Sequence, residues 1–273
     1  MSRPLDGVRV ATLEHRYPAQ LTQLLERQGA IVMSCPLLEE TPVEDARAVE
    51  RFMTLCETGA ADYVIFYTGV GVDFLMRAAP RPEAFARSVV LARGPKAVNA
   101  LRRAGARIDR VAEAPTTEGI IRTMSKEDLR GKSVLVQLYG AENVELTRAL
   151  EAQGARVTGI AIYRYRPASD AGEVSRLIDA ILEGRIDAIT FTTGPQLQFL
   201  LAAAVERGLE DALRSRLRND VVMVSVGEVT TRAIEATGFP VAVTPEDPKM
   251  GPMVSAMAEY FAGKRSQCTT PSS

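Results

Sequence analysis

The chain has 273 residues, of which 25% are charged and 46% hydrophobic, and its formal net charge is −1. This length exceeds the needs of one small core, and the composition is that of a globular protein. No apolar run approaches the roughly 20 residues of a membrane span, and the first residues lack the apolar core of an export signal, so we expect a cytoplasmic protein. The balanced charge gives no global field that favours nucleic acid or an anionic membrane.

Cysteine and histidine are too few and too scattered for the usual disulfide or metal frameworks. Cys35, Cys56 and Cys268 show no Cys-x-x-Cys spacing, and His15 is the single histidine. We therefore expect no disulfide, no structural zinc and no histidine-based metal site. A catalytic pair that needs histidine would have to use His15, which a polar loop after a strand explains equally well.

Strands and helices are expected to alternate along the chain. Helical spacing of apolar residues predicts helices that end near Gly29 and Gly154, a helix over residues 45–56 and one from Gly94 to Gly105. This alternation predicts parallel sheets with helices on both faces. Strands are predicted at residues 8–13, 31–36, 63–67, 88–92, 134–138, 156–163, 188–192, 221–226 and 241–243.

Two stretches of the chain repeat each other without a gap. Residues 62–75 align with residues 187–200 at an offset of 125, which also aligns residues 21–30 with 146–155. An offset of 133 aligns residues 94–105 with 227–238. Two copies of one α/β unit are therefore expected. The identical pairs in the first alignment are Asp62/Asp187, Phe66/Phe191, Thr68/Thr193, Gly69/Gly194, Phe74/Phe199 and Leu75/Leu200.

The order of the repeats predicts how the two copies are connected. One copy lies wholly between Tyr63 and Ile162, whereas the other begins at the N-terminus and resumes near residue 187. We predict two similar flavodoxin-like or Rossmann-like α/β/α domains, one inserted into the other, with hinge motion about a ligand cleft. The predicted domains are residues 1–36 with 168–264, and residues 42–160; residues 37–41 and 161–167 form a two-stranded linker, and residues 265–273 a disordered tail.

Small residues mark the loops that follow five predicted strands. In open parallel sheets, ligands bind at such loops, where glycine admits close approach and helix N-termini attract anions. The same loops could be N-caps and tight turns without a ligand. Gly69 and Gly71 lack the third glycine of a dinucleotide fingerprint, which would fall at Phe74. The loops are Thr68-Gly69-Val70-Gly71, Arg93-Gly94-Pro95-Lys96, Tyr139-Gly140-Ala141, Thr193-Gly194-Pro195 and Gly227-Glu228-Val229-Thr230.

No pattern typical of covalent or metal-dependent catalysis is evident. An enzyme of this sequence would act by holding a reactive substrate in one conformation. The second linker segment carries Tyr163, Arg164, Tyr165 and Arg166. These are candidate site residues, or tyrosines that pack a linker beside solvated arginines.

Taken in order, these motifs resemble the bacterial uroporphyrinogen-III synthase family over almost the whole chain. Members of that family have two similar α/β domains joined by a two-stranded linker, which agrees with the wiring predicted above. The resemblance rests on the order and spacing of Thr68-Gly-Val-Gly-Val72, Ala92-Arg-Gly-Pro-Lys-Ala97, Val136-Gln-Leu-Tyr-Gly140, Ile162-Tyr-Arg164, Asp187-Ala-Ile-Thr-Phe191, and Val226-Gly227 with Thr230.

The resemblance implies a lyase of heme biosynthesis that converts hydroxymethylbilane to uroporphyrinogen III without a metal or organic cofactor. Ring D loses its hydroxyl as water, the macrocycle closes through a spiro intermediate, and ring D becomes inverted. The substrate carries an acetate and a propionate on each pyrrole, so it is a polyanion that backbone amides could bind. We expect a monomer that receives its substrate by transient hand-over from hydroxymethylbilane synthase.

By position, the resemblance assigns catalytic roles to Tyr163, which matches a tyrosine that assists departure of the hydroxyl, and to Thr230 in a glycine turn. The chain departs from many family members at Ala97, Glu228 and Val144, where threonine, proline and arginine are common. Thr68 and Thr193 match the serine or threonine that opens each repeated helix. The substrate-binding candidates are Thr68, Gly69, Val70, Gly71, Arg93, Gly94, Lys96, Tyr139, Gly140, Thr193, Gly194, Gly227 and Arg16.

Two other classes of protein share this predicted architecture. A non-enzymatic two-domain sensor of a tetrapyrrole or small anion would keep the fold and lack turnover. A periplasmic-type binding protein has a similar insertion topology but would need an export signal, which residues 1–8 do not provide.

Overall fold

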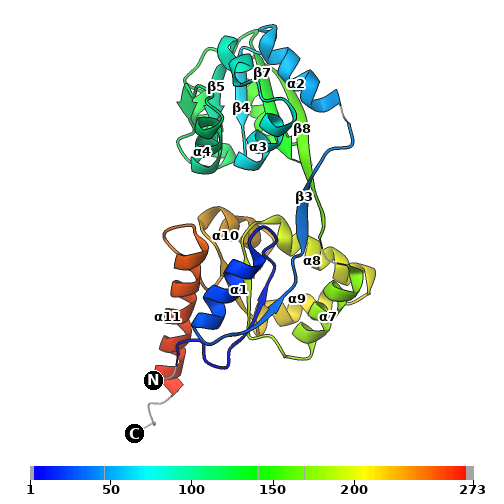
Figure 1. Cartoon of the computed structure of the whole chain (residues 1–273), viewed down its shortest axis with the longest axis vertical. Helices are drawn as coiled ribbons and strands as arrows, with labels where there is room; N and C mark the ends of the chain where they lie inside the picture. The colour runs from blue at the N-terminus through cyan, green and yellow to red at the C-terminus, as the bar shows by residue number, and fades with distance from the viewer. Residues whose placement is uncertain (1–2, 46, 140–141, 169, 269–273) are drawn as a thin grey trace. The chain divides into compact units, whose positions relative to one another are not determined.

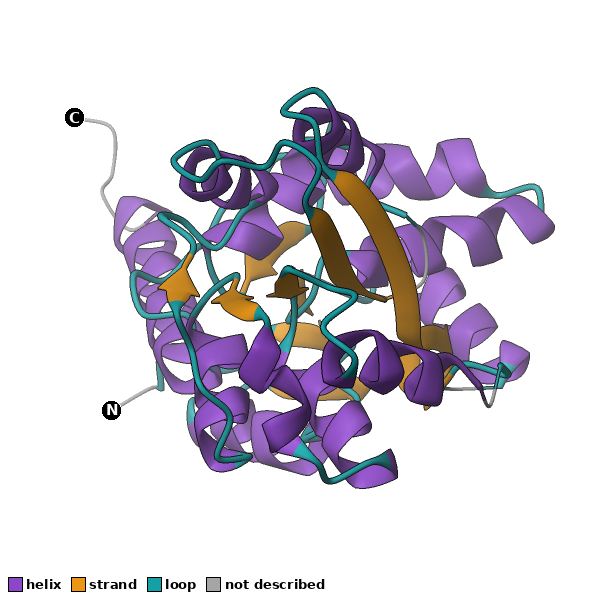
Figure 2. Cartoon of the chain, turned by 90° about the horizontal axis from the view of Figure 1, so that it is seen from above, coloured by secondary structure: helices purple, strands orange, loops and turns teal. Residues whose placement is uncertain are grey.

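The computed structural model describes residues 3–45, 47–139, 142–168 and 170–268. The chain forms two compact units: unit 1 comprises Met1–Glu39 and Arg166–Ser273, and unit 2 comprises Glu40–Tyr165. In each unit the strands are flanked by helices (Figure 1, Figure 2). Among the described residues, no helix has the length and apolar character needed to cross a bilayer.

Unit 1 is built on a four-stranded sheet in which every pair of neighbouring strands is parallel, in the order β10-β9-β1-β2. Side chains alternate between the faces of the sheet, so α7, α8 and α9 cover one face and α1 and α11 the other. The elements are β1 (Arg9–Thr12), α1 (Pro18–Arg27), β2 (Ile31–Ser34), α7 (Ala171–Leu182), β9 (Ala188–Phe191), α8 (Pro195–Glu206), α9 (Glu210–Asn219), β10 (Val222–Ser225), α10 (Glu228–Glu235) and α11 (Met250–Cys268).

Unit 2 is built on a six-stranded sheet in the order β3-β8-β7-β4-β5-β6. Helices α2, α3 and α4 cover one face, and α5 and α6 cover the other. The elements are β3 (Leu38–Pro42), α2 (Arg47–Glu57), β4 (Tyr63–Phe66), α3 (Gly69–Ala78), the 3₁₀ helix η1 (Pro82–Arg87), β5 (Val89–Ala92), α4 (Pro95–Arg103), β6 (Arg110–Val111), α5 (Thr117–Met124), β7 (Ser133–Tyr139), α6 (Val144–Glu151) and β8 (Arg156–Pro167).

Equivalent strands have the same spatial order in the two sheets. Val10 of β1 pairs with Ala188 of β9, as Val134 of β7 pairs with Tyr63 of β4. The two units differ in the order in which the chain visits these strands. Unit 1 begins with β1, the equivalent of β7, whereas in unit 2 the chain reaches β4 before β7. In both sheets the chain leaves this central pair in opposite directions, which makes it the switch point where open α/β sheets bind ligands.

Equivalent glycines end the helices that follow these strands. Gly29 after α1 has a φ of 97°, and Gly154 after α6 has a φ of 88°. Both lie in the left-handed region that favours glycine, so the predicted helix ends are confirmed.

The predicted strand over residues 241–243 is wrong. Val243 forms only an isolated parallel bridge with Val224. Pro240 and Pro245 flank this segment, and proline has no backbone N–H with which to extend a ladder. The bridge lies where β5 pairs with β6 in unit 2, because Leu91 opposite Arg110 corresponds to Val224 opposite Val243.

Two further predictions need correction. The tail was expected from residue 265, but α11 continues to Cys268, and the Arg265 guanidinium donates a hydrogen bond to the Asp6 carbonyl at 2.6 Å. Pro252 lies in the first turn of α11, where proline is tolerated, and no proline follows it before Cys268; residues 269–273 lie outside the described residues. The connector expected at residues 161–167 is the end of one long strand, β8, which pairs with β7 as far as Tyr163; its predicted pairing with residues 37–41 agrees with the place of β3 beside β8.

In each sheet one of the repeated aspartates, Asp62 or Asp187, forms hydrogen bonds that link the two central strands. The Asp62 carboxylate accepts hydrogen bonds from the Ser133 backbone N–H at 2.8 Å and from Lys132 at 3.1 Å. Asp187 accepts from the backbone N–H of Arg9 at 2.8 Å and from its guanidinium. The Ser133 amide lowers the pKa of Asp62, and the Arg9 guanidinium lowers the pKa of Asp187.

These pKa shifts predict a dependence of stability on pH. The unfolded chain binds the proton first, so the stabilisation is fully present above the ordinary aspartate pKa of about 3.9 and is lost as the pH falls through the lower folded value. Urea denaturation of the wild type should therefore show a midpoint that decreases as the pH is lowered from 5 to 3. Asp62→Asn and Asp187→Asn should each have a flatter profile, and slopes identical to the wild type would contradict this.

Candidate functional site

The turn between β4 and α3 lies at the carboxyl end of the unit 2 sheet, beside its switch point. Thr68 is in extended conformation and caps α3, because its Oγ1 accepts a hydrogen bond from the Gly71 N–H at 3.0 Å. The amides of Gly69 and Val70 belong to the first turn, where no carbonyl of the helix can pair with them. The predicted threonine cap is confirmed, and the turn offers backbone donors at a helix N-terminus.

A buried glutamine supports this turn. Gln137 of β7 has no exposed surface, and its Oε1 accepts from the Thr68 N–H at 3.3 Å and lies 3.5 Å from Thr68 Oγ1. Its Nε2 donates to the Leu138 carbonyl at 2.7 Å. A Cβ on Gly71 would lie 2.2 Å from the amide carbon, so glycine at this position makes room for the glutamine.

Tyr163 of β8 lies against the same turn. Its ring stacks between Phe74 at 5.6 Å and Tyr139 at 5.8 Å, and its hydroxyl donates to Thr68 Oγ1 at 3.2 Å. The side chain is fully buried. Burial raises the pKa of Tyr163 far above its usual range, so this phenol is a neutral hydrogen-bond donor.

Tyr67 and Arg93 extend the cluster toward the next strand. The Tyr67 ring lies 6.5 Å from that of Tyr139, and the Arg93 guanidinium lies 5.3 Å from the Tyr67 centroid, within reach of a cation–π interaction. The Tyr67 hydroxyl is buried without a well-formed hydrogen bond to another described residue, although Asn143 lies near enough to act on it. Burial raises the pKa of Tyr67, an effect that Arg93 partly offsets.

The start of α4 adjoins the start of α3. A Cβ on Gly69 would lie 2.6 Å from the Lys96 carbonyl oxygen, so the two helix N-termini pack closely. Gly94 gives α4 no side-chain cap, and Pro115 occupies the space beside Gly94 where a Cβ would project. Arg93 and the exposed Lys96 add positive charge at this edge. These features are those of an anion-binding edge.

In unit 1 the turn after β1, which is equivalent to the turn after β7, is occupied by a carboxylate of the protein itself. The buried Glu14 Oε1 accepts from the backbone N–H groups of Arg16 at 2.8 Å and Tyr17 at 3.1 Å, and Oε2 accepts from Thr192 Oγ1 at 2.5 Å. Gln196 accepts from the Thr193 N–H at 3.1 Å. The backbone amide of Arg16, a predicted substrate ligand, is therefore already engaged.

Thr230 lies in the first turn of α10, which begins at Gly227 without a side-chain cap. The Thr230 side chain is 6% exposed, and its N–H donates to the Gly227 carbonyl at 3.0 Å. Pro248 packs beside Gly227 as Pro115 packs beside Gly94. The two glycine turns predicted from the repeat therefore share one geometry.

The remaining predicted positions have simpler surroundings. Ala97 is equivalent to Thr230 and packs in the core of unit 2. Glu228 is ion-paired with Arg232 at 2.8 Å, and Val144 is 50% exposed at the start of α6. Gly140 lies outside the described residues. No cluster of three or more metal-binding side chains occurs in the part of the chain that the structure describes.

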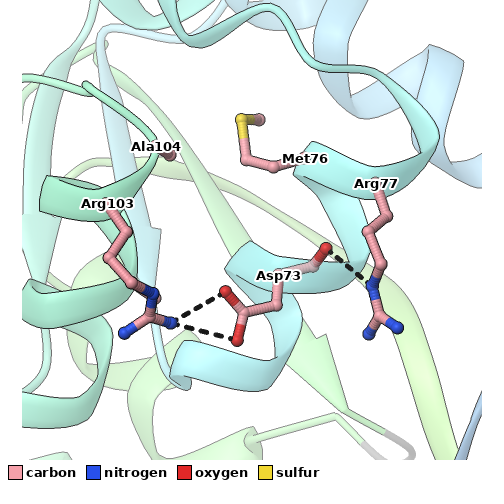
Figure 3. Close-up of a pocket in the computed structure, with 6 residues that line it drawn as sticks. Asp73, Met76, Arg77, Arg103 and Ala104 are labelled. Atoms are coloured by element: carbon pink, nitrogen blue, oxygen red, sulfur yellow. Dashed lines mark hydrogen bonds and ion pairs between the residues drawn. The ribbon is translucent and has the colours of Figure 1, made fainter.

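One hollow of unit 2 is on its helical surface (Figure 3). It has a volume of about 490 Å³ and lies between α3 and α4. Its charged groups are engaged with one another: Arg103 donates to the Asp73 carboxylate at 3.0 Å, and Arg77 donates to the Asp73 carbonyl at 3.2 Å. A smaller hollow of about 290 Å³ is lined by Phe74 and Ile162, on the side of the tyrosine cluster.

Sequence reasoning missed three buried polar residues and two aromatic ones at these strand ends. Gln137 could have been suspected as the polar residue in an apolar strand. Gln196 could have been suspected because the alignment of the two repeats makes it equivalent to Gly71. No signal distinguished Glu14 or Tyr67 from ordinary loop or core residues, and Phe74 was marked only by the repeat pair Phe74/Phe199.

The fold and these turns define a two-unit α/β protein whose candidate binding loops follow the carboxyl ends of parallel strands. A family model described as HEM4, uroporphyrinogen-III synthase HemD, matches residues 19–255. The chain belongs to the uroporphyrinogen-III synthase family, a family of lyase-type enzymes of tetrapyrrole biosynthesis, as its motifs predicted.

Similar curated proteins span almost the whole chain. An uncharacterized protein YjjA of Bacillus subtilis is 30% identical over 271 residues, which cover 97% of this chain and all of that protein. A putative uroporphyrinogen-III synthase of Methanothermobacter thermautotrophicus is 31% identical over 245 residues, which cover 88% of this chain and 93% of that protein.

Solved structures of the uroporphyrinogen III synthase of Thermus thermophilus are also similar. A triple mutant of that enzyme is 29% identical, with a TM-score of 0.77, 94% of this chain covered and 100% of the other. The wild-type enzyme in another crystal form is 28% identical, with a TM-score of 0.61 and coverages of 95% and 100%. These matches confirm the two-domain α/β fold class.

Spectroscopic titration can test the burial of the tyrosine cluster. The unfolded chain should ionise its tyrosines near pH 10, whereas Tyr67 and Tyr163 should keep their protons, so stability should fall as the pH rises above about 10. Tyrosinate absorbance of the wild type should show a late step that coincides with alkaline unfolding and is smaller in Tyr163→Phe. Release of all seven tyrosine protons near pH 10 by folded protein would contradict this.

Proposed function

We propose that this protein is a uroporphyrinogen-III synthase that dehydrates and cyclises hydroxymethylbilane and inverts ring D through a spiro intermediate. The observation that carries the proposal is the cluster of Tyr163, Thr68 and Gln137 at the switch point of unit 2. Tyr163 and Thr68 are the positions that the family resemblance assigns to substrate chemistry, and in this fold they are hydrogen-bonded to each other.

The substrate's carboxylates would bind at helix N-termini. At the start of α4, Arg93 and Lys96 add positive charge beside a helix N-terminus, whose dipole favours an anion. The start of α10 in unit 1 has the same glycine-turn geometry with Thr230 at its third helical position. Local donors of this kind can bind a polyanion although the chain has a net charge of −1.

Thr68 would be the group of the cluster that contacts the departing hydroxyl. Its side chain is partly exposed, whereas Tyr163 is fully buried behind it. Thr68 Oγ1 lies 3.5 Å from Gln137 Oε1, a long hydrogen bond that one to a substrate oxygen could replace. Tyr163 would strengthen Thr68 as a donor by hydrogen-bonding to its oxygen. Because burial raises the pKa of Tyr163, this role requires no ionised tyrosine.

The isomer assay tests the proposed function directly. Wild-type protein is mixed with enzymatically generated hydroxymethylbilane, the products are oxidised, and the porphyrin isomers are separated. Isomer III should predominate, because the enzyme must invert ring D. Isomer I alone, which forms spontaneously, would show that the protein is not a synthase and would favour a sensor of the same fold.

Removing the Tyr163 hydroxyl should impair turnover and leave the fold intact. Tyr163→Phe retains the stacked ring and loses one hydrogen bond, a stability cost of about 1 kcal/mol. We expect kcat to fall by about 10²-fold, because Thr68 would lose the hydrogen bond that orients and strengthens it as a proton donor. Tyr260→Phe on α11 is the matched control and should retain wild-type kcat. Full activity of folded Tyr163→Phe would exclude this role.

The Thr230 hydroxyl can be tested with two substitutions. Thr230→Ala should reduce kcat/KM more than Thr230→Ser, because serine keeps the hydroxyl at the start of α10. Circular dichroism should show both variants folded, since each removes few buried atoms. Equal kcat/KM values would mean that the hydroxyl is dispensable.

A further inference from the structure

The two units place a glutamine amide at the same point from different elements. The strand registers make Leu13 equivalent to Gln137, and the offset of 125 makes Gln196 equivalent to Gly71. Unit 1 therefore has leucine on the strand and glutamine on the helix, whereas unit 2 has glutamine on the strand and glycine on the helix. Gln137 and Gln196 are both fully buried.

The two amides make similar hydrogen bonds, although the carbonyls that accept from them are one residue apart in the aligned strands. Gln196 Oε1 accepts from the N–H groups of Thr192 at 2.8 Å and Thr193 at 3.1 Å, and its Nε2 donates to the Leu13 carbonyl at 2.7 Å. Gln137 Oε1 accepts from the Thr68 N–H, and its Nε2 donates to the Leu138 carbonyl. In each unit one side chain joins the Thr-Gly turn to the end of the neighbouring strand.

An amide suits this place because it offers one acceptor and two donors. In unit 2 one amide pairs with both the Thr68 backbone N–H and the Leu138 carbonyl, and a buried polar group left unpaired would be unfavourable. Because Nε2 is tied to a carbonyl, Oε1 must face Thr68. The hydroxyl of Thr68 has one proton and points it to Oε1, so its oxygen is left to accept from Tyr163 and Gly71.

We propose that Gln137 is a positioning residue for the reaction, which holds the Thr68 hydroxyl and the Gly69 and Val70 amides in the geometry that the substrate requires. This inference rests on the proposed function. We expect that Gln137 can be replaced by a glutamine at position 71, because Gln196 holds the Thr-Gly turn of unit 1 from that position, although Thr193 does not cap α8.

The test is a swap of the two arrangements within unit 2. Gln137→Leu removes the amide, Gly71→Gln places a second amide in occupied space, and the double variant Gly71→Gln/Gln137→Leu reproduces the arrangement of unit 1. Ser88→Ala is the matched control, because Ser88 Oγ donates a buried hydrogen bond to the Ala61 carbonyl at the opposite end of the β4–β5 pair. Melting temperature, kcat, KM and the ratio of isomers III to I are measured for each variant.

Gln137→Leu should lower kcat by about 10- to 100-fold, the range expected when a reacting group is misplaced by about 1 Å, with a smaller change in KM. Gly71→Gln should be impaired as well, and the double variant should recover most of the lost kcat. Ser88→Ala should melt at a lower temperature and keep wild-type kcat and isomer ratio, which separates positioning from general stability.

The positioning role would be overturned if Gln137→Leu kept wild-type kcat, or if the double variant were no more active than the single ones. In either case, formation of isomer III by the wild type would still support the proposed function. Isomer I alone from the wild type would overturn both. If Gln137→Leu does not fold, Gln137→Met, which keeps the length of the side chain, takes its place with the same expected results.

Discussion

A parallel strand that turns directly into a helix leaves backbone groups at the sheet edge without ladder partners, and the rest of this molecule's candidate site depends on how those groups are paired. Beside the switch point of each unit, a buried glutamine amide pairs with backbone groups of the turn and of the strand end. The threonine that opens the helix is thereby held in one orientation. The Tyr163–Thr68 hydrogen bond and the tight packing of α3 on α4 both follow from that fixed turn.

From this shared backbone the two units build different surfaces. In unit 1 the Glu14 carboxylate takes the amides that follow β1, so this turn already contains its anion. In unit 2, Tyr67, Tyr139 and Tyr163 gather with Arg93 at the equivalent edge. The duplicated Thr-Gly motif is therefore a common support, and the residues around it decide whether the edge is closed or available to a ligand.

Much of the fold could be predicted from the sequence because a repeat reports on topology without any knowledge of side-chain contacts. The insertion of one unit, the parallel sheets and the helix ends at Gly29 and Gly154 all follow from matching residues and periodicity. The site was less predictable. Gln137 contacts Thr68, which is 69 positions away along the chain, and Glu14 contacts Thr192, which is 178 positions away. No local sequence pattern encodes contacts between residues so far apart. The segment at 241–243 misled prediction because its apolar residues are strand-like while the flanking prolines prevent a ladder.

Hydrogen bonds between hydroxyl groups hold the segment at residues 241–244, where the predicted strand is absent. Thr244, which follows the single bridge at Val243, lies 2.7 Å from Thr231 Oγ1 of α10, and Thr231 in turn lies 2.5 Å from Ser225 Oγ of β10. The equivalent positions in unit 2 are the apolar Ala92, Val98 and Val111, beside a two-residue strand. Hydroxyl contacts in unit 1 thus tie this segment to β10 and α10 where ladder hydrogen bonds are few. Because the same segment carries Pro248 onto Gly227, this hydroxyl cluster fixes the glycine turn that presents Thr230.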